Sequence, residues 1–386
     1  MTDKNKSIKK VPNLRFPEFE GEWEVKKLGE VAPLQRGFDL PNQNIVDGNI
    51  PIVYSNGILK FHNQSKSKAP GLITGRSGTI GKFTFIEDGE YWPHNTSLWV
   101  TDFCGNIPKY IYYLYQTINI EQFSTGSGVP TLNRNDVHRK KCSIPSTAEQ
   151  KKIAEFLSAL DSKIQTQKKT IDVLSVLKTS LSSKIFSREI RFKDENGNDF
   201  PEWESKKLGE VLEIQGGYAF KSSSFNQGTT KVIRIGDIEP RIILNNFSGV
   251  YSNETPDEKY IVKKEDFVMA LSGATFGKVG KILDSDIAYI NQRVASFKTE
   301  QCLEFFYQLV LTPDFKSYIN SIPTASAQPN ISNSDIANYK TLLPSIPEQQ
   351  KIANFLSSID AKIDVENQIL QQLEMQKKYF LANLFI

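Results

Sequence analysis

The feature that most constrains this 386-residue chain is a long internal repeat. The stretch Trp23–Val31, with its Leu-Gly-Glu-Val ending, recurs 180 residues later as Trp203–Val211. The stretch Pro145–Ser158 recurs 199 residues later as Pro344–Ser357. So many ordered matches indicate duplication of one unit of about 190 residues, because short-period solenoid repeats would recur every 20–50 residues.

Shorter matches lie between these two blocks. Ser77-Gly78 with Gly81-Lys82 is matched by Ser272-Gly273 with Gly277-Lys278, and the second loop is one residue longer. Asn95 aligns with Asn291 at an offset of 196. The repeat therefore covers the interior of each unit as well as its ends.

The first part of each unit has the pattern of a β-rich α/β domain. Short runs of β-branched and aromatic residues alternate with Gly, Pro, Asn and Asp, which predicts strands separated by turns. The predicted strands include Ile50–Tyr54, Lys82–Ile86, Ser97–Val100, Lys231–Ile235, Lys278–Leu283 and Arg293–Phe297. Tyr110–Tyr115 and Leu303–Val310 are predicted to be short helices.

The second part of each unit predicts one long helix with a heptad seam. Apolar residues recur at alternating spacings of four and three, which is typical of the a and d positions of a coiled coil. The seam residues are Ile153, Leu157, Leu160, Ile164, Ile171, Leu174, Leu181 and Ile185 in the first copy, and Ile352, Leu356, Ile359, Ile363, Leu370, Leu373, Phe380 and Leu384 in the second. Polar residues interrupt the seam at Gln167, Lys178, Glu366 and Lys377.

The starts of both helices carry a capping pattern. Ser146 with Glu149, and Ser345 with Glu348, have the spacing of a capping box. Two equal apolar stripes with no other long helix to cover them are expected to pack against each other, and the chain order requires an antiparallel pair. We therefore predict an α+β fold with two β-rich α/β domains in tandem, separated by two long helices that form an antiparallel coiled coil. The predicted limits are 1–145 and 188–344 for the domains, and 146–187 and 345–386 for the helices.

Composition excludes several classes of protein. Hydrophobic residues make up 39% and charged residues 24%, as in ordinary globular proteins. No run approaches the roughly 20 apolar residues of a membrane span, and the polar start MTDKNKSIKK is unlike a secretory signal. The three cysteines form no CxxC pair and the three histidines are scattered, so no metal site is expected. We expect a soluble, cytoplasmic chain.

No catalytic motif stands out. Both Gly-Lys pairs lack the leading Gly and the following Ser or Thr of a phosphate-binding P-loop. An Asn-Pro-Pro-aromatic methyltransferase motif is absent from the sequence as well. The net charge of +3 is too small to indicate nucleic-acid binding by itself, although a local basic face can exist within a balanced total.

The order globule, long helix, globule, long helix resembles the specificity subunit of type I restriction–modification enzymes. The resemblance is carried by the Trp-Glu…Leu-Gly-Glu openings at 23 and 203, the Ser-Gly…Gly-Lys loops ending at Lys82 and Lys278, and the Pro-Ser-x-x-Glu-Gln helix starts at 145 and 344. It covers nearly the whole chain, and the doubled order is more specific than any single motif.

The resemblance implies a non-catalytic DNA-recognition subunit. Each domain would read one half of a bipartite double-stranded DNA target, and the helices would set the spacing and dock two methyltransferase (modification) subunits. S-adenosylmethionine would be bound by those partners, and ATP and Mg by a motor–nuclease (restriction) subunit in the full complex. This chain itself would bind no cofactor and no metal.

Residues kept in both copies cannot distinguish two different half-sites, so they are predicted to hold the fold or the phosphates. The phosphate candidates are Ser77, Gly78, Lys82 and Asn95 in the first copy and Ser272, Gly273, Lys278 and Asn291 in the second. A glycine-rich loop lets the backbone approach closely, and a lysine neutralises one phosphate. A β-hairpin with a solvated lysine is the alternative explanation of these loops, and a hydrogen-bonding role within a turn is the alternative for Asn95 and Asn291.

Residues that differ between the copies are the candidates for reading bases. Arg grips guanine, and Asn or Gln grips adenine, through two hydrogen bonds. The candidates are Arg36, Arg76, His94 and Arg134 in the first domain and Lys221, Arg234, Arg241, Gln292 and Arg293 in the second. For each of them a solvated surface position is the competing explanation, and His94 equally fits a hydrogen-bonded role inside the fold. The polar loops 124–127 and 324–330 are also expected to face DNA.

Three other interpretations remain open from the sequence. The chain fits a coiled-coil scaffold whose globules bind proteins and not DNA, although this leaves the two Gly-Lys loops without a purpose. A single-chain DNA-cleaving or DNA-methylating enzyme is disfavoured by the missing cofactor motifs. A silent allele, or one that serves methylation only, would have the same sequence pattern.

Overall fold

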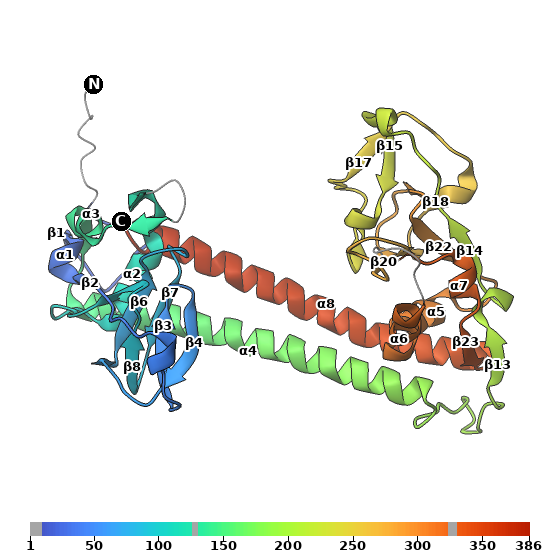
Figure 1. The fold of residues 1–386 in the computed structure, drawn as a ribbon, viewed down its shortest axis with the longest axis horizontal. Helices are drawn as coiled ribbons and strands as arrows, with labels where there is room; N and C mark the ends of the chain where they lie inside the picture. The colour runs from blue at the N-terminus through green and yellow to red at the C-terminus, as the bar shows by residue number, and fades with distance from the viewer. Residues whose placement is uncertain (1–9, 126–129, 323–329) are drawn as a thin grey trace. The chain divides into compact units, whose positions relative to one another are not determined.

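The structure is a computed structural model that describes residues 10–125, 130–322 and 330–386. It separates into two compact units. The first comprises Met1–Lys169 with Asn367–Ile386, and the second comprises Thr170–Glu366. Both long helices therefore contribute residues to each unit (Figure 1). We call the globule that holds β1 to β12 domain 1, and the globule that holds β13 to β23 domain 2.

Within the described residues, domain 1 is rich in short strands. Its strands are β1 (Glu24–Lys27), β2 (Leu34–Arg36), β3 (Ile50–Tyr54), β4 (Gly57–His62), β5 (Ser67–Lys68), β6 (Gly71–Gly75), β7 (Phe83–Ile86), β8 (Glu90–Pro93), β9 (Ser97–Val100), β10 (Ser124–Thr125), β11 (Thr131–Leu132) and β12 (Lys141–Ile144). Its helices are α1 (Leu28–Val31), α2 (Pro108–Thr117) and α3 (Arg134–Arg139), with 3₁₀ turns η1 (Asn42–Asn44) and η2 (Ile120–Phe123). The long helix α4 (Thr147–Phe186) follows.

Domain 2 repeats this plan with longer loops. Its described strands are β13 (Glu204–Lys207), β14 (Glu213–Gly216), β15 (Phe225–Ile233), β16 (Arg241–Ile242), β17 (Val250–Ser252), β18 (Ile261–Val262), β19 (Phe267–Ala270), β20 (Val279–Ile282), β21 (Ala288–Ile290), β22 (Val294–Lys298) and β23 (Lys340–Leu343). Its helical segments are η3 (Leu208–Glu210), η4 (Ser222–Ser224), η5 (Ile235–Asp237), η6 (Glu258–Tyr260), α5 (Leu303–Val310), α6 (Pro313–Ser321) and α7 (Asn333–Ala337). The long helix α8 (Ile346–Asn383) follows.

The two domains share one sheet topology. Domain 1 has a sheet of order β2-β9-β6-β7, and domain 2 has the matching order β14-β22-β19-β20 with β16 added at the edge. A second sheet of order β4-β3-β8-β5 corresponds to β17-β15-β21-β18. In both second sheets one central pair is parallel, β3 with β8 and β15 with β21. The duplication predicted from the sequence is therefore a duplication of fold.

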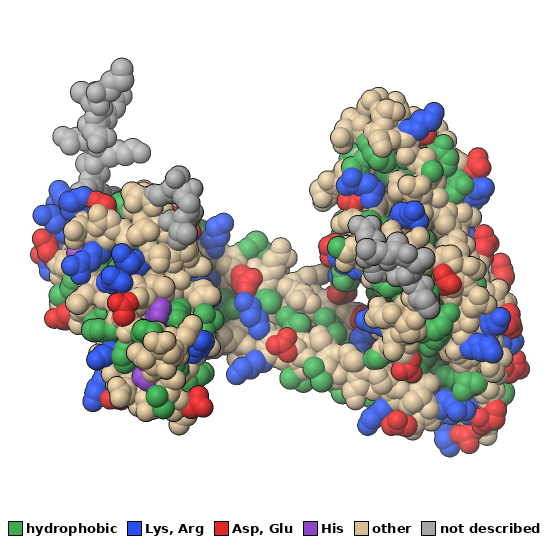
Figure 2. Space-filling view, viewed as in Figure 1, with side chains coloured by type: hydrophobic (Ala, Val, Ile, Leu, Met, Phe, Trp, Pro, Cys, Tyr) green, Lys and Arg blue, Asp and Glu red, His purple; other side chains and the backbone are tan. Residues whose placement is uncertain are grey.

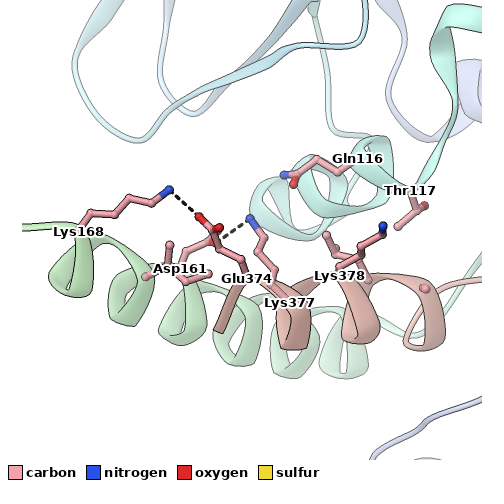
Figure 3. Close-up of a pocket in the computed structure, with 10 residues that line it drawn as sticks. Gln116, Thr117, Asp161, Lys168, Glu374, Lys377 and Lys378 are labelled. Carbon is pink, nitrogen blue, oxygen red and sulfur yellow. Dashed lines mark ion pairs between the residues drawn. The ribbon is translucent and has the colours of Figure 1, made fainter. Parts of the chain in front are cut away.

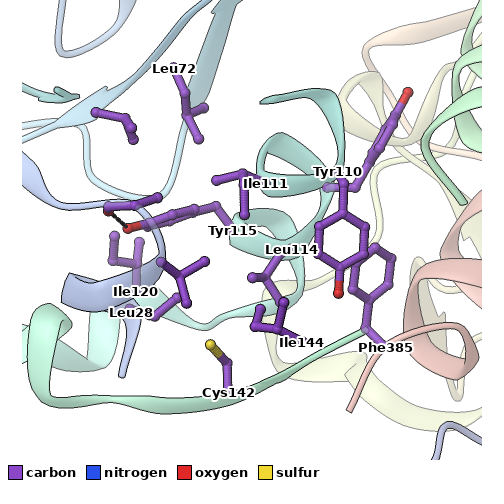
Figure 4. Close-up of a cluster of buried hydrophobic side chains, with 14 of the residues drawn as sticks. Leu28, Leu72, Tyr110, Ile111, Leu114, Tyr115, Ile120, Cys142, Ile144 and Phe385 are labelled. Carbon is purple, nitrogen blue, oxygen red and sulfur yellow. Dashed lines mark hydrogen bonds between the residues drawn. The ribbon is translucent and has the colours of Figure 1, made fainter. Parts of the chain in front are cut away.

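The core of domain 1 is built around the tyrosine-rich helix α2. Tyr110, Tyr113 and Tyr115 are all fully buried, and the Tyr115 hydroxyl donates to the carbonyl oxygen of Ala32 at 2.9 Å (Figure 4). Phe385, beyond the end of α8, stacks on Tyr110 with ring centroids 5.3 Å apart. Burying such a ring stabilises the fold by about 2 kcal/mol, so the end of α8 is part of this core.

The core of domain 2 uses the end of α4 in the same way. Ile185 is fully buried there, and Phe186 contacts Phe305 of α5 with ring centroids 5.4 Å apart. Beneath the helices, Phe267 stacks on Phe297 across neighbouring strands at 4.5 Å. Each domain is thus completed by the end of one long helix.

The helices run antiparallel where they meet within each unit. In the first unit Lys377 pairs with Asp161 at 2.7 Å, and in the second Lys178 pairs with Asp360 at 2.6 Å. Lys178 and Lys377 are two of the polar interruptions of the predicted seam, so they join the helices at equivalent points. The seam residues Ile153, Leu157, Leu160, Ile164, Ile352 and Leu356 are buried, and Ile171, Leu174, Leu181, Ile359, Ile363, Leu370 and Leu373 are half-buried.

The Trp-Glu and Glu-Gln motifs of domain 1 meet at the start of α4. Glu149 is buried, accepts two hydrogen bonds from Arg15 at 2.9 and 2.8 Å, and accepts a third from the indole of Trp23 at 3.3 Å. The neighbouring Gln150 accepts from the backbone N–H of Ile107 at 2.9 Å. A buried carboxylate requires such partners, and its negative charge suits a helix N-terminus.

Domain 2 repeats this anchor with Arg191, Trp203 and Glu348. Glu348 is fully buried and accepts from Arg191 at 3.3 and 3.0 Å and from the Trp203 indole at 3.0 Å. The predicted capping boxes are therefore wrong in part. Ser146 does cap the backbone N–H of Glu149 at 3.3 Å, whereas the buried hydroxyl of Ser345 has no hydrogen-bond partner. Both glutamates bind Arg and Trp instead of reaching back to the cap.

The glycine of each Leu-Gly-Glu opening is explained by close packing. A Cβ on Gly29 would lie 2.9 Å from the side chain of His138, and one on Gly209 would lie 2.8 Å from that of Ala337. The following Glu30 accepts the backbone N–H of Lys27 at 3.0 Å. The shared residues of the Leu-Gly-Glu openings therefore serve the fold. The candidate DNA-binding surface is to be sought elsewhere on each domain.

Candidate nucleic-acid interface

In domain 1 several loops converge at one edge of the sheets, which we call loop edge 1. The backbone N–H groups of Arg76 and Ser77 both donate to the carbonyl oxygen of Thr96, at 2.8 and 3.2 Å. Ser77 also forms a β-bridge with Thr131. His94 lies two residues before Thr96 on the same turn. The structure thus brings the predicted residues Arg76, Ser77 and His94 together with Thr131, which is up to 55 positions away in the chain.

The Ser-Gly…Gly-Lys loop of domain 1 needs its glycines. Gly78 and Gly81 have φ angles of +80° and +83°, a conformation that costs little only for glycine. The backbone N–H of Gly78 donates to Pro130, and the Lys82 ammonium donates to the carbonyl oxygen of Asn56 at 2.5 Å. Lys82 is exposed, so its charge lies at the tip of the β3–β4 hairpin.

The corresponding loop of domain 2 has the same backbone form. Gly273 and Gly277 have φ angles of +80° and +71°. The Lys278 ammonium pairs with Glu239 at 2.8 Å, and Thr275 donates to the carbonyl oxygen of Ile235 at 3.0 Å. We call this edge of domain 2 loop edge 2. In domain 1 the shared lysine reaches the β3–β4 hairpin of the neighbouring sheet, whereas in domain 2 it reaches Glu239, in the loop before β16 of its own sheet.

The structure corrects one correspondence between the two copies. Phe38 bridges His94 in domain 1, and Tyr218 bridges Asn291 in domain 2, so His94 is the counterpart of Asn291. The residues after them, Asn95 and Gln292, are therefore equivalent. The alignment of Asn95 with Asn291 is wrong by one residue, because a one-residue shift lets two asparagines coincide without matching backbone positions.

His94 is tied into loop edge 1. Its Nδ1 atom lies 3.0 Å from the hydroxyl of Thr96, and its ring lies 4.2 Å from the ring of Tyr54, between centroids. Burial lowers the pKa of His94, so the neutral form is favoured. His94 is part of the surface and is also hydrogen-bonded within it.

The arginine candidates of domain 1 differ in their partners. Arg36 is exposed and lies 3.6 Å from Asp39, a weak surface pair. The side chains of Arg76 and Arg134 form no ion pair or hydrogen bond within the described residues. Arg76 begins the Ser-Gly loop and Arg134 begins α3 just after β11, so both lie beside loop edge 1 with their donors available.

In domain 2 the structure gathers some candidates and separates others. Arg293 lies on loop edge 2 and donates to the side chain of Asn330 at 3.2 Å, while Arg234 is bound by Asp237 at 3.1 Å. Arg241 forms an ion pair with Asp364 of α8 and so faces the long helix.

Lys221 lies three residues after Tyr218, which bridges Asn291 beside loop edge 2. Its backbone N–H donates to Glu254 at 3.0 Å, and the same carboxylate accepts from the Tyr218 hydroxyl at 3.2 Å. Hydrogen bonding keeps the pKa of Glu254 below its ordinary value. Glu254 is a charged group near loop edge 2 that the sequence did not single out.

Tyr54, Asn56 and Thr96 were also missed in domain 1. They carry no shared motif, and only the parallel pairing of β3 with β8 brings the first two to the loop edge. Of the two polar loops expected to face DNA, residues 126–127 and 324–329 lie outside the described residues. Asn330, at the end of the second loop, bridges Ser272.

A hollow beside the helices in the first unit carries several charges (Figure 3). Lys168 pairs with Glu374 at 2.8 Å, and Lys377 pairs with Asp161 at 2.7 Å. Because most of these charges are paired with one another, the hollow is a feature of helix packing and not a binding site.

The described ranges hold no group of three or more His, Cys, Asp or Glu residues arranged to bind a metal ion. Over the same ranges, no helix has the length and apolar character to span a bilayer. Lys and Arg side chains are interleaved with Asp and Glu on the visible face of each unit (Figure 2), in keeping with the net charge of +3.

Comparison with known proteins identifies a family. The model of the type I restriction modification DNA specificity domain matches residues 20–175 and again residues 201–375. The MjaVIII specificity subunit of Methanocaldococcus jannaschii is 31% identical over 287 residues, 69% of this chain and 67% of that protein. The EcoBI specificity subunit of Escherichia coli is 31% identical over 183 residues, 46% of this chain and 36% of that protein.

Solved structures agree on the fold. The S subunit of a type I restriction–modification system from M. genitalium superposes with a TM-score of 0.64 at 16% identity, covering 97% of this chain and 99% of that one. A chain from a structure of type I system assembly gives 0.55 at 16% identity, with 93% and 96% covered. With two family matches that together span most of the sequence, the chain belongs to the family of type I restriction–modification DNA specificity subunits.

Proposed function

We propose that this chain reads a bipartite double-stranded DNA target, with domain 1 on one half and domain 2 on the other. The observation that carries this proposal is the pair of loop edges. They share their sheet order and the positive-φ glycines of their Gly-Lys loops, but carry different side chains at equivalent positions. Two surfaces with the same fold but different side chains are suited to two half-sites of different sequence. The limits 1–145 and 188–344 for the recognition domains are part of this proposal.

Shared residues at the edges would contact phosphates. Lys82 and Lys278 each present an ammonium, and Ser77 and Ser272 each present a hydroxyl. The backbone N–H groups of Ser77 and Gly78 already donate to carbonyls, so phosphate contact would fall mainly on side chains. Such contacts fix the position on DNA without reading sequence.

The differing residues would read bases. Arg76 and Arg134 in domain 1, and Arg293 in domain 2, lie on or beside the loop edges and fit guanine. Arg241 faces α8, which makes it the weakest of the candidates. The remaining candidates lie close to the edges: the side chains of Arg36, His94 and Arg234 share their polar atoms with neighbours, whereas Lys221 is bonded only through its backbone N–H.

The long helices would dock two modification subunits. Val176 of α4 is 70% exposed, and Met375, at the equivalent point of α8, is 56% exposed. Val173 and Leu177 extend the exposed apolar surface on α4 in the second unit, and Tyr379 extends it on α8 in the first. An apolar patch in each unit suits one partner copy each.

The chain would act without catalysis of its own. S-adenosylmethionine would be bound by the modification subunits, and ATP and Mg by the motor–nuclease subunits of the full complex. The balanced charge implies weak DNA binding by the isolated chain, because few phosphates would be neutralised, and rising salt would weaken these contacts further. Closure of the partners around the duplex would then supply the remaining affinity.

The test is to express the chain with the modification subunit from the same genome in a host that lacks adenine methylation. Modified-base sequencing is expected to show one split motif with a methylated adenine in each half. A stable complex of the two proteins without any methylated motif would contradict the proposal and favour a scaffold or a silent allele.

A further inference from the structure

Two equivalent amide side chains stand at the tips of equivalent turns, and we propose that Asn95 and Gln292 each read an adenine at the same place in the two half-sites. This inference rests on the proposed function and deepens it. It also changes the assignment of Asn95, which the sequence placed among the phosphate contacts.

The turn geometry is the same in both domains. The N–H of Ser97 donates to the carbonyl oxygen of His94 at 2.9 Å, and that of Val294 donates to the carbonyl oxygen of Asn291 at 2.8 Å. These bonds close four-residue turns between β8 and β9 and between β21 and β22. Asn95 and Gln292 each occupy the second position, at the tip.

The next residue of each turn is fixed to the Ser-Gly loop. The carbonyl oxygen of Thr96 accepts from Arg76 and Ser77, and that of Arg293 accepts from Leu271 at 2.9 Å. Backbone hydrogen bonds therefore join the turn to the candidate phosphate loop at each edge. A tip beside a phosphate-binding loop is suited to enter a groove while that loop holds the backbone.

The tip amides are not used by the fold. Neither Asn95 nor Gln292 makes a side-chain hydrogen bond within the described residues, Gln292 is exposed and Asn95 is half-buried. Thr96, by contrast, bonds through both its hydroxyl and its carbonyl oxygen. An amide with both its donor and acceptor free at a rigid tip is suited to recognition.

The chemistry favours adenine. A carboxamide presents one N–H donor group and one oxygen acceptor in a plane, which match adenine N7 and N6–H in the major groove. Guanine and thymine offer acceptors there and cytosine offers a donor, so none of them satisfies both atoms of the amide. The longer arm of Gln292 keeps the same chemistry one methylene further from the backbone.

The first test uses isosteric variants in the complex with the modification subunits. Asn95→Asp and Gln292→Glu replace the N–H donor group by an acceptor without changing shape. Selection from a randomised duplex library is expected to give the wild-type split motif with one adenine in each half that depends on these residues. N95D should relax the preference for that adenine in the first half-site only, and Q292E should relax it in the second half-site only.

The second test removes a single hydrogen-bond acceptor from the DNA. A duplex with 7-deazaadenine at the assigned position keeps base pairing and replaces only N7, by C–H. Wild-type affinity is expected to fall about tenfold for that probe, whereas an Asn95→Ala complex should bind both duplexes equally. A merely structural role of Asn95 would lower affinity for both duplexes and leave the N7 effect intact.

The possible outcomes distinguish a failure of the proposed function from a failure of the adenine-reading inference. A wild-type complex that enriches no split motif overturns the proposed function and this inference with it. A split motif that stays unchanged in both isosteric variants, or an N7 effect that persists in N95A, overturns the inference alone.

Discussion

At the scale of single residues, the repeat separates two kinds of conservation. Trp203, Glu348 and their counterparts are kept because they form a buried hydrogen-bonded anchor at the start of each long helix. Lys278 and its counterpart are kept at the loop edges, where each ammonium also bonds to a neighbouring loop. The first set accounts for the fold, and the second for the candidate interface.

The anchor of domain 2 allows a matched test. Glu348→Gln leaves Arg191 without its buried anion and is expected to destabilise domain 2 by about 3 kcal/mol in denaturant unfolding. The control is Glu202→Gln. Glu202 pairs with the same arginine but its side chain is 83% exposed, so its loss should lower the free energy of unfolding by less than about 0.5 kcal/mol. Equal losses in the two variants would contradict the anchor.

His138 gives a pH dependence of known sign. Its Nε2 atom accepts from the N–H of Leu34 at 2.8 Å, and burial and the nearby Arg134 lower its pKa. Because the folded pKa lies below the unfolded value of about 6.5, its contribution is complete above pH 6.5 and is lost as pH falls. Between pH 7 and 5, wild-type stability should fall more than that of His138→Gln, which accepts the same bond without titrating. Parallel pH profiles would refute this role.

The sequence indicated which residues were shared but not why. Arg15 and Arg191 are essential to the anchors, yet they escape pattern matching because the segments before the two tryptophans differ in length. Asn95 was paired with the wrong partner because identity was weighed above backbone position. Side chains that meet only through parallel strand pairing, such as Tyr54, leave no local signal.

At the scale of elements, the seam and its polar interruptions set how the helices pair. The predicted heptads correspond to the buried and half-buried faces of α4 and α8. The lysines that interrupt them form two of the ion pairs between the helices. Heptad patterns are strong signals over long helices, whereas short strands such as β5 and β16 have no periodicity and were not predicted.

The ion pair in the second unit is expected to help fix register. Lys178→Ala should lower the stability of the helix pair by about 1 kcal/mol, because Lys178 is only 16% exposed and Asp360 also binds Gln308. Exchanging the two charges, with Lys178→Asp and Asp360→Lys in one variant, should restore part of the lost stability. Lys168→Ala, in a more exposed pair, should have little effect on thermal unfolding. A loss as large in K168A as in K178A would argue against this role.

At the scale of the whole molecule, the duplication explains why one chain carries two recognition surfaces. The tandem order and the fold class followed from the repeat alone, because duplicated sequence implies duplicated fold. The sheet orders and the loop edges did not, since they depend on pairings between strands far apart in sequence.

The spacer role predicts the effect of a shorter coiled coil. Removing one heptad from each helix, such as 166–172 and 366–372, keeps the heptad phase and shortens each helix by about 10 Å. The unread gap between the half-sites should shrink by up to about three base pairs, with both half-sites unchanged, in modified-base sequencing. An unaltered gap would mean that helix length does not set the spacing.

The most direct measurement is a domain exchange followed by modified-base sequencing. Residues 188–344 are replaced by the corresponding segment of a family member with a different target, and the chimaera is expressed with the modification subunit. If each domain reads one half-site, only the second half of the methylated motif changes, and the first half and the adenine methylation remain. A change in both halves, or in neither, would contradict the division of DNA reading between the two domains.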